Sequence, residues 1–259
     1  MNLYFVVHSF TDTVFHGNPA GVCPLEEWLD DSLMQRIAAE NRLSETAFFV
    51  RKEDHFELRW FTPAIEVDLC GHATLASAYV LFDHLGHEED VITFQTQSGE
   101  LVVWKEGKSL VMDFPSRPGV PIDAPDELVT GLGREPAEVY RARDYLAIFE
   151  NEQGVRDLEP DFATLKRLDC TGVIASAPGS EVDFVSRFFA PLAGIPEDPV
   201  TGSAHSTLTP YWAARLGKKQ LTARQVSERG GELACSLRDD RVLIAGRAVL
   251  YFKGFLSTD

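Results

Sequence analysis

The chain has 259 residues, of which 44% are hydrophobic and 25% charged, an ordinary composition for a globular protein. Acidic residues outnumber basic ones by 40 to 24, so the formal charge is −16. This charge argues against a general nucleic-acid binder and against docking on anionic membranes, because both need a basic surface. The length allows one large core or two cores of roughly 130 residues each.

The four cysteines form no CxxC pair, fit no zinc ribbon and are too few for a disulfide framework in a chain of this length. Residues 1–8 lack the basic start and the long apolar run of a signal peptide. No stretch approaches the ~18 consecutive apolar residues of a membrane span. We therefore expect a cytoplasmic protein with reduced thiols.

Strand-like and helix-like patterns alternate along the first half of the chain. Turn formers are frequent over 12–22. Helical spacing after polar start residues predicts a helix over 33–41, and an apolar run of helix length begins at Gly71 and closes at Gly86. Alternating or β-rich composition predicts strands at 3–7, 46–51, 56–61, 91–96, 101–105 and 109–114.

Four short segments recur in the second half of the chain, in the same order and at nearly one offset. The pairs are Arg59–Pro63 with Arg187–Pro191, Gly71–Ala73 with Gly202–Ala204, Leu85–Gly86 with Leu216–Gly217, and Gly99–Leu101 with Gly231–Leu233. Chance similarity is the alternative, but four ordered anchors favour two copies of one α/β unit. Three prolines over 115–121 cannot sustain a helix or a central strand, so we expect domains at 1–115 and 122–259.

The segments that follow Gly71 and Gly202 share an absence of charge. No Asp, Glu, Lys or Arg occurs over 69–82 or over 200–214. A helix without a charged face is a buried one, so each repeat is expected to be a curved sheet around its own helix. Pro210 should kink or restart the second of these helices.

The N-terminus of a buried helix favours anions, because its first N–H groups lack intrahelical partners and the peptide dipoles add positive charge there. Gly71 with His72, and Gly202 with Ser203, would form two such sites, and these would bracket one cleft that suits a small carboxylate. The alternative is that the glycines only cap buried helices.

Three ionisable residues are candidates for proton transfer. His72 directly follows Gly71, where its pKa would tend to fall and keep the imidazole neutral. Glu45 lies at the edge of an apolar strand, where desolvation would raise its pKa toward the range useful for acid–base work, although a surface glutamate is the default. Asp198 precedes Gly202 by four residues and would either cap the helix or act in the site.

Two more residues allow two interpretations each. Cys70 would be a thiol base or a small buried hydrophobe. Asn18 would form a turn or contact the substrate. The sequence contains no GxGxxG, Walker, HExxH or GxSxG motif, so it predicts no metal and no cofactor.

Four blocks of the sequence resemble the phenazine-biosynthesis PhzF-like family, which shares its fold with diaminopimelate epimerase. The blocks are Phe10–Gly21, Asn41–Phe48, Phe61–Ala76 and Glu197–Gly217. In this order they extend over nearly the whole chain. The resemblance implies an α+β fold with two pseudo-repeated domains, each a mixed sheet or barrel wrapped around a central helix, with the site between them.

The resemblance also implies a cofactor-independent isomerase, commonly a homodimer. In the phenazine enzyme, a glutamate moves a proton during isomerisation of a dihydro-hydroxyanthranilate, and that glutamate matches Glu45. The histidine and the aspartate of the family match His72 and Asp198. A non-catalytic binding module on the same scaffold is the alternative, and the motifs do not identify the substrate.

The family residues that help to hold the substrate carboxylate match Gly202 and Ser203, with Gly71 opposite. The epimerase relatives use one cysteine from each domain. Here Cys70 occupies the first position and Thr201 the second. A two-cysteine racemase is therefore not expected, and a single base would return the proton to the same face of the substrate.

Overall fold

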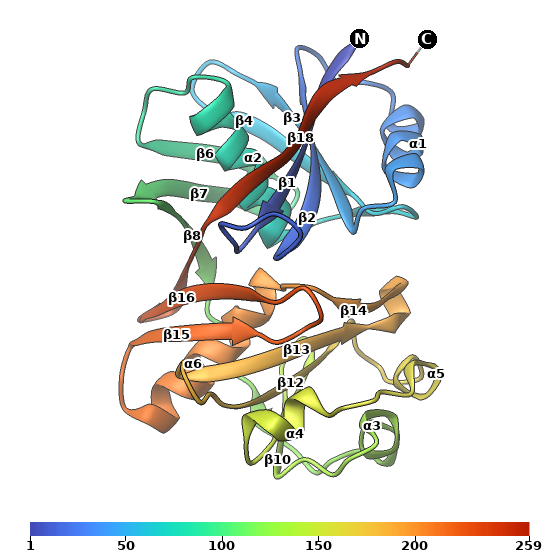
Figure 1. Ribbon diagram of the computed structural model, residues 1–259, viewed down its shortest axis with the longest axis vertical. Helices are drawn as coiled ribbons and strands as arrows, with labels where there is room; N and C mark the ends of the chain where they lie inside the picture. The colour runs from blue at the N-terminus through green and yellow to red at the C-terminus, as the bar shows by residue number, and fades with distance from the viewer. Residues whose placement is uncertain (259) are drawn as a thin grey trace. The chain divides into compact units, whose positions relative to one another are not determined.

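The computed structural model describes residues 1–258, and the chain divides into two compact units (Figure 1). Unit 1 contains residues 1–113 together with the C-terminal segment from Ala245 onward, and unit 2 contains residues 114–244. The predicted ranges, 1–115 and 122–259, assign that C-terminal segment to the other unit. The segment belongs to unit 1 because its strand forms an antiparallel ladder with the first strand of the chain. Within the described part of the chain, no helix is long and apolar enough to cross a membrane.

Unit 1 is one curved mixed sheet with two helices. Its strands pair in the order β18-β1-β2-β3-β4-β6-β7-β8, with β2–β3 and β4–β6 parallel and the other pairs antiparallel. The elements are β1 (Asn2–Ser9), β2 (Asn18–Leu25), α1 (Asp31–Asn41), β3 (Glu45–Arg51), β4 (Phe56–Phe61), β5 (Glu66–Val67), α2 (Gly71–His84), β6 (Val91–Thr96), β7 (Gly99–Glu106), β8 (Ser109–Pro115) and β18 (Ala248–Leu256).

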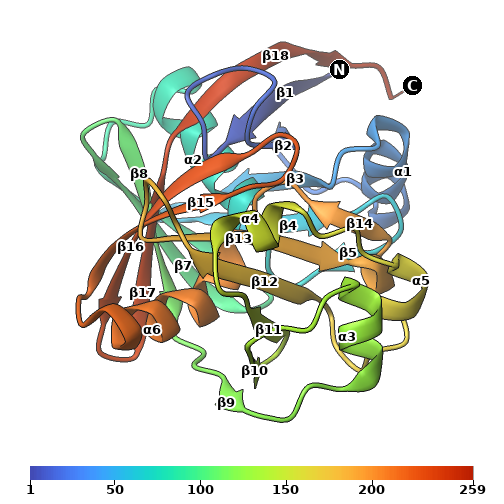
Figure 2. The same ribbon diagram turned by 60° about the horizontal axis from the view of Figure 1, so that its bottom comes forward.

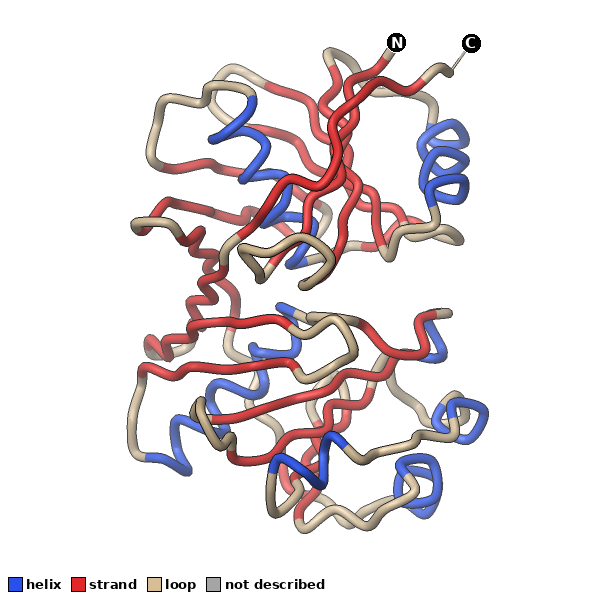
Figure 3. The backbone as a smooth tube through the Cα atoms, in the orientation of Figure 1, coloured by secondary structure: helices blue, strands red, loops and turns tan. Residues whose placement is uncertain are grey.

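The two helices of unit 1 differ in how deeply they are buried. Eleven of the 14 residues of α2 are buried, as expected for a helix without a charged face. By contrast, α1 buries only Met34, Ile37 and Ala38, which pack with Tyr4 and Phe48 in a separate apolar cluster. Figure 3 shows the strands of unit 1 between these helices. The prediction of a central helix inside a mixed sheet is confirmed.

Unit 2 repeats the same order of strand pairs. It runs β9-β10-β11-β12-β13-β15-β16, with β11–β12 and β13–β15 parallel (Figure 2). The elements are β9 (Val120–Pro121), α3 (Asp126–Leu132), β10 (Glu138–Arg141), β11 (Tyr145–Ile148), α4 (Glu152–Arg156), α5 (Phe162–Leu165), β12 (Val173–Pro178), β13 (Phe184–Ala190), η1 (Pro191–Ala193), β14 (Ile195–Asp198), η2 (Gly202–Ala204), α6 (His205–Leu216), β15 (Gln220–Gln225), β16 (Gly231–Arg238) and β17 (Arg241–Gly246).

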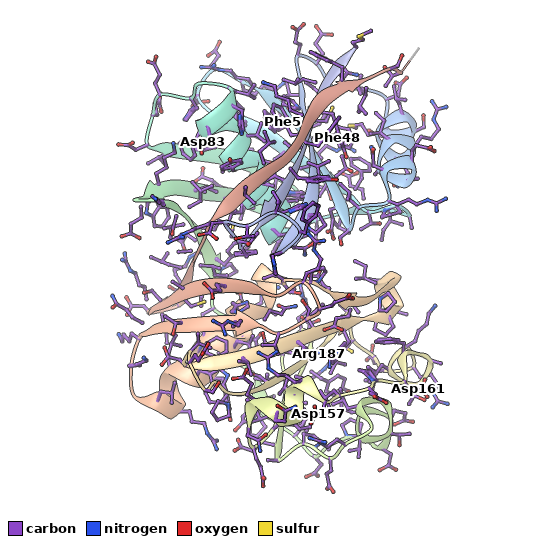
Figure 4. All side chains as sticks on the ribbon, viewed as in Figure 1. Phe5, Phe48, Asp83, Asp157, Asp161 and Arg187 are labelled. Carbon is purple, nitrogen blue, oxygen red and sulfur yellow. The ribbon has the colours of Figure 1, made fainter. Side chains whose placement is uncertain are left out.

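The internal repeat extends to the side chains. In unit 1 the Arg59 guanidinium donates two 2.7 Å hydrogen bonds to Glu66. In unit 2 Arg187, labelled in Figure 4, makes the same bidentate pair with Glu197 at 2.7 and 2.8 Å. Each pair joins a long strand to the short strand that follows it, directly before the glycine-headed helix. The predicted two-fold repetition of one unit is therefore confirmed.

Pro210 neither restarts nor ends the second central helix. A 3₁₀ turn, η2, leads into α6, which continues through Pro210 to Leu216. Proline has no N–H for the carbonyl of residue i−4, here Ser206. The backbone N–H of Arg117 donates to that carbonyl at 2.9 Å, so a segment outside the helix satisfies it.

The turn-rich segment 12–22 is only partly a turn, because β2 begins at Asn18. Pairing with β1 extends this strand despite its proline and glycine. A Cβ at Gly21 would lie 2.2 Å from the Tyr4 hydroxyl oxygen, so this position needs glycine for close packing. A glycine in the sequence can therefore mark close packing within a strand, as Gly21 does, as well as a turn.

Candidate active site

Three strand ends lie side by side at one edge of the sheet in unit 1. Ser9 ends β1 opposite Asn18 at the start of β2, and Ala20 lies opposite Glu45 at the start of β3. The hydroxyl of Ser9 donates a 2.7 Å hydrogen bond to the carbonyl of His72 in the first turn of α2. These contacts bring Glu45 and the N-terminus of α2 to the same edge.

His72 lies between an acid and a thiol. Its Nε2 atom is 3.2 Å from Oε2 of Glu45, and its Nδ1 atom is 3.4 Å from Sγ of Cys70. The imidazole is only 4% exposed, and this burial lowers the pKa of His72 to about 3. The ring is therefore neutral at pH 7, so its 3.2 Å approach to Glu45 is a contact between a neutral ring and a carboxyl group rather than an ion pair.

The neutral ring allows two proton arrangements with the same heavy-atom positions. With the proton on Nε2, an N–H group faces the carboxylate of Glu45 and Nδ1 accepts from the thiol of Cys70. With the proton on Nδ1, the ring donates to Cys70 and accepts from a protonated Glu45. The three side chains thus lie in sequence, acid, imidazole and thiol, with contacts of 3.2 and 3.4 Å.

The start of α2 also fits an anion. Cys70 is the N-cap residue, with extended backbone angles, and its side chain makes no capping hydrogen bond. The carbonyl of Cys70 accepts from the backbone N–H and from the hydroxyl of Thr74, which closes the first turn. The N–H groups that follow, from Gly71 onward, are those that the start of a helix offers to a carboxylate.

The corresponding turn in unit 2 is held by a polar side-chain network. The Thr201 hydroxyl donates to the buried carboxylate of Asp198 at 2.5 Å, and the Thr201 backbone N–H donates to Gln225 at 2.8 Å. The Gln225 amide donates to the Asp198 carbonyl at 2.6 Å. These bonds shape the backbone ahead of Gly202 and Ser203.

Gln225 was missed by the sequence analysis, because it stands at the end of an ordinary strand pattern, and only its buried position shows its role. His205 in the same region is wholly buried, and burial lowers its pKa to about 4. Its Nδ1 atom donates to the carbonyl of Thr201 at 2.9 Å, which fixes its tautomer. His205 therefore has a structural role, which is to hold the Thr201 carbonyl.

The predicted site residues therefore form two groups, one in each unit. Unit 1 contains Glu45, His72 and Gly71, with the wholly buried Asn18 at the same sheet edge. Unit 2 contains Asp198, Gly202 and Ser203. Cys70, which the sequence left open, joins the first group through its contact with His72.

Glu45, Cys70 and His72 also make up a possible metal donor set, with ligand atoms within 4.8 Å of one another. The imidazole, however, turns Nε2 toward the acid and Nδ1 toward the thiol. A single ion binds only one nitrogen of a ring, so this orientation suits proton transfer better than shared coordination.

Comparison with known proteins shows the family of the chain. The family model described as "Phenazine biosynthesis-like protein" matches residues 7–254. The chain belongs to this family. A Pseudomonas aeruginosa protein named as an uncharacterized isomerase is 53% identical over 97% of this chain and 97% of its own length.

Solved structures place the chain in its fold class. A PhzF-family protein of Enterococcus faecalis superposes with a TM-score of 0.95 at 48% identity, covering 98% of each chain. A probable proline racemase of Agrobacterium radiobacter has a TM-score of 0.68 at 12% identity, covering 100% of this chain and 94% of that one, and shows the fold alone. The predictions of an epimerase-like fold and of an isomerase are confirmed at this level.

Proposed function

We propose that this protein is a cofactor-independent isomerase in which Glu45 moves a proton on a small carboxylate substrate. The observation that carries the proposal is the 3.2 Å contact between Glu45 and neutral His72 at the start of α2. A carboxylate that can hold a proton and a site that can hold an anion meet at one place.

The reaction balances with Glu45 as the single base. Its carboxylate takes a proton from a C–H bond of the substrate, and the electron pair of that bond enters the adjoining unsaturated system. The N–H groups at the start of α2 stabilise the negative charge. Glu45 then returns the proton to another carbon on the same face, while His72 orients the carboxylate from Nε2.

Thr201 supports a single base rather than two thiols. The residue that matches the second cysteine of the epimerase relatives is this threonine, and its hydroxyl is bonded to Asp198. Contacts of the substrate with Gly202, Ser203 and Asn18, and a catalytic role for Asp198, stay predictions.

The substitution Glu45→Gln tests the proposal, because it keeps the shape of the side chain and removes its basicity. A panel of small carboxylates that includes a dihydro-hydroxyanthranilate is first screened for stabilisation of the wild type by thermal shift. The compounds that bind are then incubated in D₂O, and deuterium incorporation is followed by NMR. We expect the substitution to lower the exchange rate by about 10²–10⁴-fold.

The matched control is Glu53→Gln, a substitution at an exposed glutamate in a turn of the same unit. It should leave the exchange rate unchanged. Unchanged exchange in the Glu45 variant would exclude Glu45 as the base. Carboxylate binding by the wild type with no exchange for any compound would favour the binding module.

A further inference from the structure

The turn between β10 and β11 contains a buried acid that no step of the proposed reaction uses. Asp144 is 3% exposed and directly precedes β11. Its Oδ2 atom accepts two hydrogen bonds from the Arg143 guanidinium, from Nε at 3.0 Å and from Nη2 at 2.7 Å. Its Oδ1 atom is also buried and has no hydrogen-bond partner among the described residues. Because a buried carboxylate oxygen without a partner is costly, its presence calls for an explanation.

The strand registers of the two units show which place Asp144 occupies. In unit 1 the parallel ladder of β2 and β3 begins with Ala20 opposite Glu45. In unit 2 the ladder of β11 and β12 begins one position later, with Tyr145 opposite Val173 (Figure 2). The offset is one position because, two residues after the ion-paired arginine of each unit, a phenylalanine lies opposite the second residue of β3 and the first residue of β12. Asp144 is therefore the counterpart of Ala20, and unit 2 has an acid one strand away from the place that Glu45 takes in unit 1.

Asp144 lies at the sheet edge of unit 2 that leads to the turn before α6. The backbone N–H of Tyr145 donates to the carbonyl of Gly172 at 3.2 Å, so the starts of β11 and β12 are adjacent. A Cβ at Gly172 would clash with the ring of Phe188, which therefore packs over this glycine. Phe188 in turn lies opposite Asp198, whose carboxylate holds the turn that leads into η2. Contacts between neighbours thus lead from Asp144 to the predicted substrate-binding turn of the same unit.

Arg143 decides which kind of hydrogen-bond donor suits the free oxygen of Asp144. Its guanidinium contacts only Oδ2, and the resulting ion pair is neutral overall. A neutral pair gives a buried ammonium group little net attraction to offset the loss of its hydration. A hydroxyl group supplies a hydrogen without a charge and loses less hydration. The pair of Asp144 and Arg143 therefore favours a hydroxyl donor at Oδ1 over an ammonium group.

We propose that Asp144 is a specificity-determining residue of the isomerase, whose Oδ1 atom accepts a hydrogen bond from a hydroxyl group of the substrate. The substrate is then a small carboxylate that carries a hydroxyl group. Asp144 holds this hydroxyl and moves no proton in the reaction. The assignment rests on the proposed function, in which the carboxylate group of the substrate binds at the helix starts. It gives the partnerless oxygen of Asp144 a partner when the substrate is bound.

Isothermal titration calorimetry of the full-length chain tests the proposal with two sets of probes that differ in one group. The sets are propionate, lactate and L-alanine, and benzoate, 3-hydroxybenzoate and 3-(aminomethyl)benzoate. In at least one set, the hydroxyl compound should bind the wild type about 10-fold or more tightly than the compound without a donor, because a hydrogen bond to a buried charged group is worth that factor. It should also bind more tightly than the ammonium compound.

The substitution Asp144→Ala gives unit 2 the residue of unit 1. It should abolish the preference for the hydroxyl compound and leave the affinity of the donor-free compound unchanged. Asp144→Asn keeps the shape of the side chain and a neutral acceptor, so it should retain a preference of about three-fold. The matched control is Asp123→Ala, at an exposed aspartate of the same unit, and it should keep the wild-type preference.

A wild type without a hydroxyl preference in either set, including one that binds none of the six compounds, overturns the proposal. A preference that survives Asp144→Ala overturns it, and so does an equal loss of affinity for both compounds, which would indicate a structural role. If the alanine variant does not fold, an undiminished preference in Asp144→Asn decides against the proposal. Deuterium exchange separates this result from the proposed function. Exchange without a hydroxyl preference contradicts the role of Asp144 alone, and a preference that depends on Asp144 without exchange contradicts the role of Glu45 alone.

Discussion

The starts of the two central helices are the same place in two copies of one unit, yet they differ in chemistry. Strand register identifies the counterparts: Thr46 lies opposite Phe61, and Val173 lies opposite Phe189. The position before Thr46 is Glu45, and the position before Val173 is Gly172. The unit 2 counterpart of the proposed base therefore has no side chain.

The imidazole and the thiol are replaced in the same way. Cys70 and His72 correspond to Thr201 and Ser203. A Cβ at Gly172 would lie 2.3 Å from the ring of Phe188, so an aromatic ring fills the space that a carboxylate would need. One repeat thus has the acid, imidazole and thiol of the proposed proton transfer, and the other has none of these three side chains at the corresponding positions. This asymmetry supports the proposal of a single base.

The largest effect should follow from giving unit 2 the missing acid. We expect Gly172→Glu to destabilise the fold by about 4 kcal/mol, because it forces a carboxylate into a position filled by Phe188. Urea denaturation measures the loss. Thr171→Glu is the matched control at the exposed neighbouring residue, and it should change stability by less than about 0.5 kcal/mol. Equal stability of the two variants would show that the position tolerates an acid.

The two buried histidines, one in each unit, should make the stability of the fold depend on pH. The folded-state pKa values of His72 and His205 are about 3 and about 4, lowered from 6.5 by burial. Between pH 6.5 and these folded-state values, the unfolded chain binds more protons than the folded one. The free energy of unfolding should therefore fall as the pH drops below 6.5, by up to about 1.4 kcal/mol per pH unit for each histidine.

His205→Asn should remove its share of this slope between pH 6.5 and 5, because asparagine can still donate to the Thr201 carbonyl but does not titrate. Urea denaturation at several pH values measures it. The half-buried His87, substituted in the same way, is the control and should keep the wild-type slope. An unchanged slope in the His205 variant would mean that this histidine titrates normally in the folded protein.

The smallest effect is expected at Cys70. We expect Cys70→Ser to lower deuterium exchange into a bound carboxylate by about 10-fold or less, because a hydroxyl still contacts Nδ1 of His72 but gives up its proton less readily. Exchange is followed by NMR as for the Glu45 variant. Cys235→Ser, at a buried thiol of unit 2, is the control and should leave exchange unchanged. A loss as large as that of Glu45→Gln would make the thiol an equal partner in proton transfer.

The sequence by itself determined the features that depend on neighbouring residues. Runs without charge predicted both central helices, recurring segments predicted the repeat, and the position after Gly71 singled out His72. The two helices and the repeat are confirmed, because burial of a helix and the polarity of its N-terminus follow from residues within a few turns of one another. The role of His72 stays a prediction.

Only the tertiary structure decided the contacts between residues far apart in the chain. β18 returns to pair with β1, Gln225 supports the turn before Gly202, and the N–H of Arg117 satisfies the carbonyl that Pro210 leaves open. Such pairings depend on how whole strands and helices pack, so no local pattern marks them. The contact of Glu45 with His72 is of this kind, since sheet register and the packing of α2 together bring the acid to the imidazole.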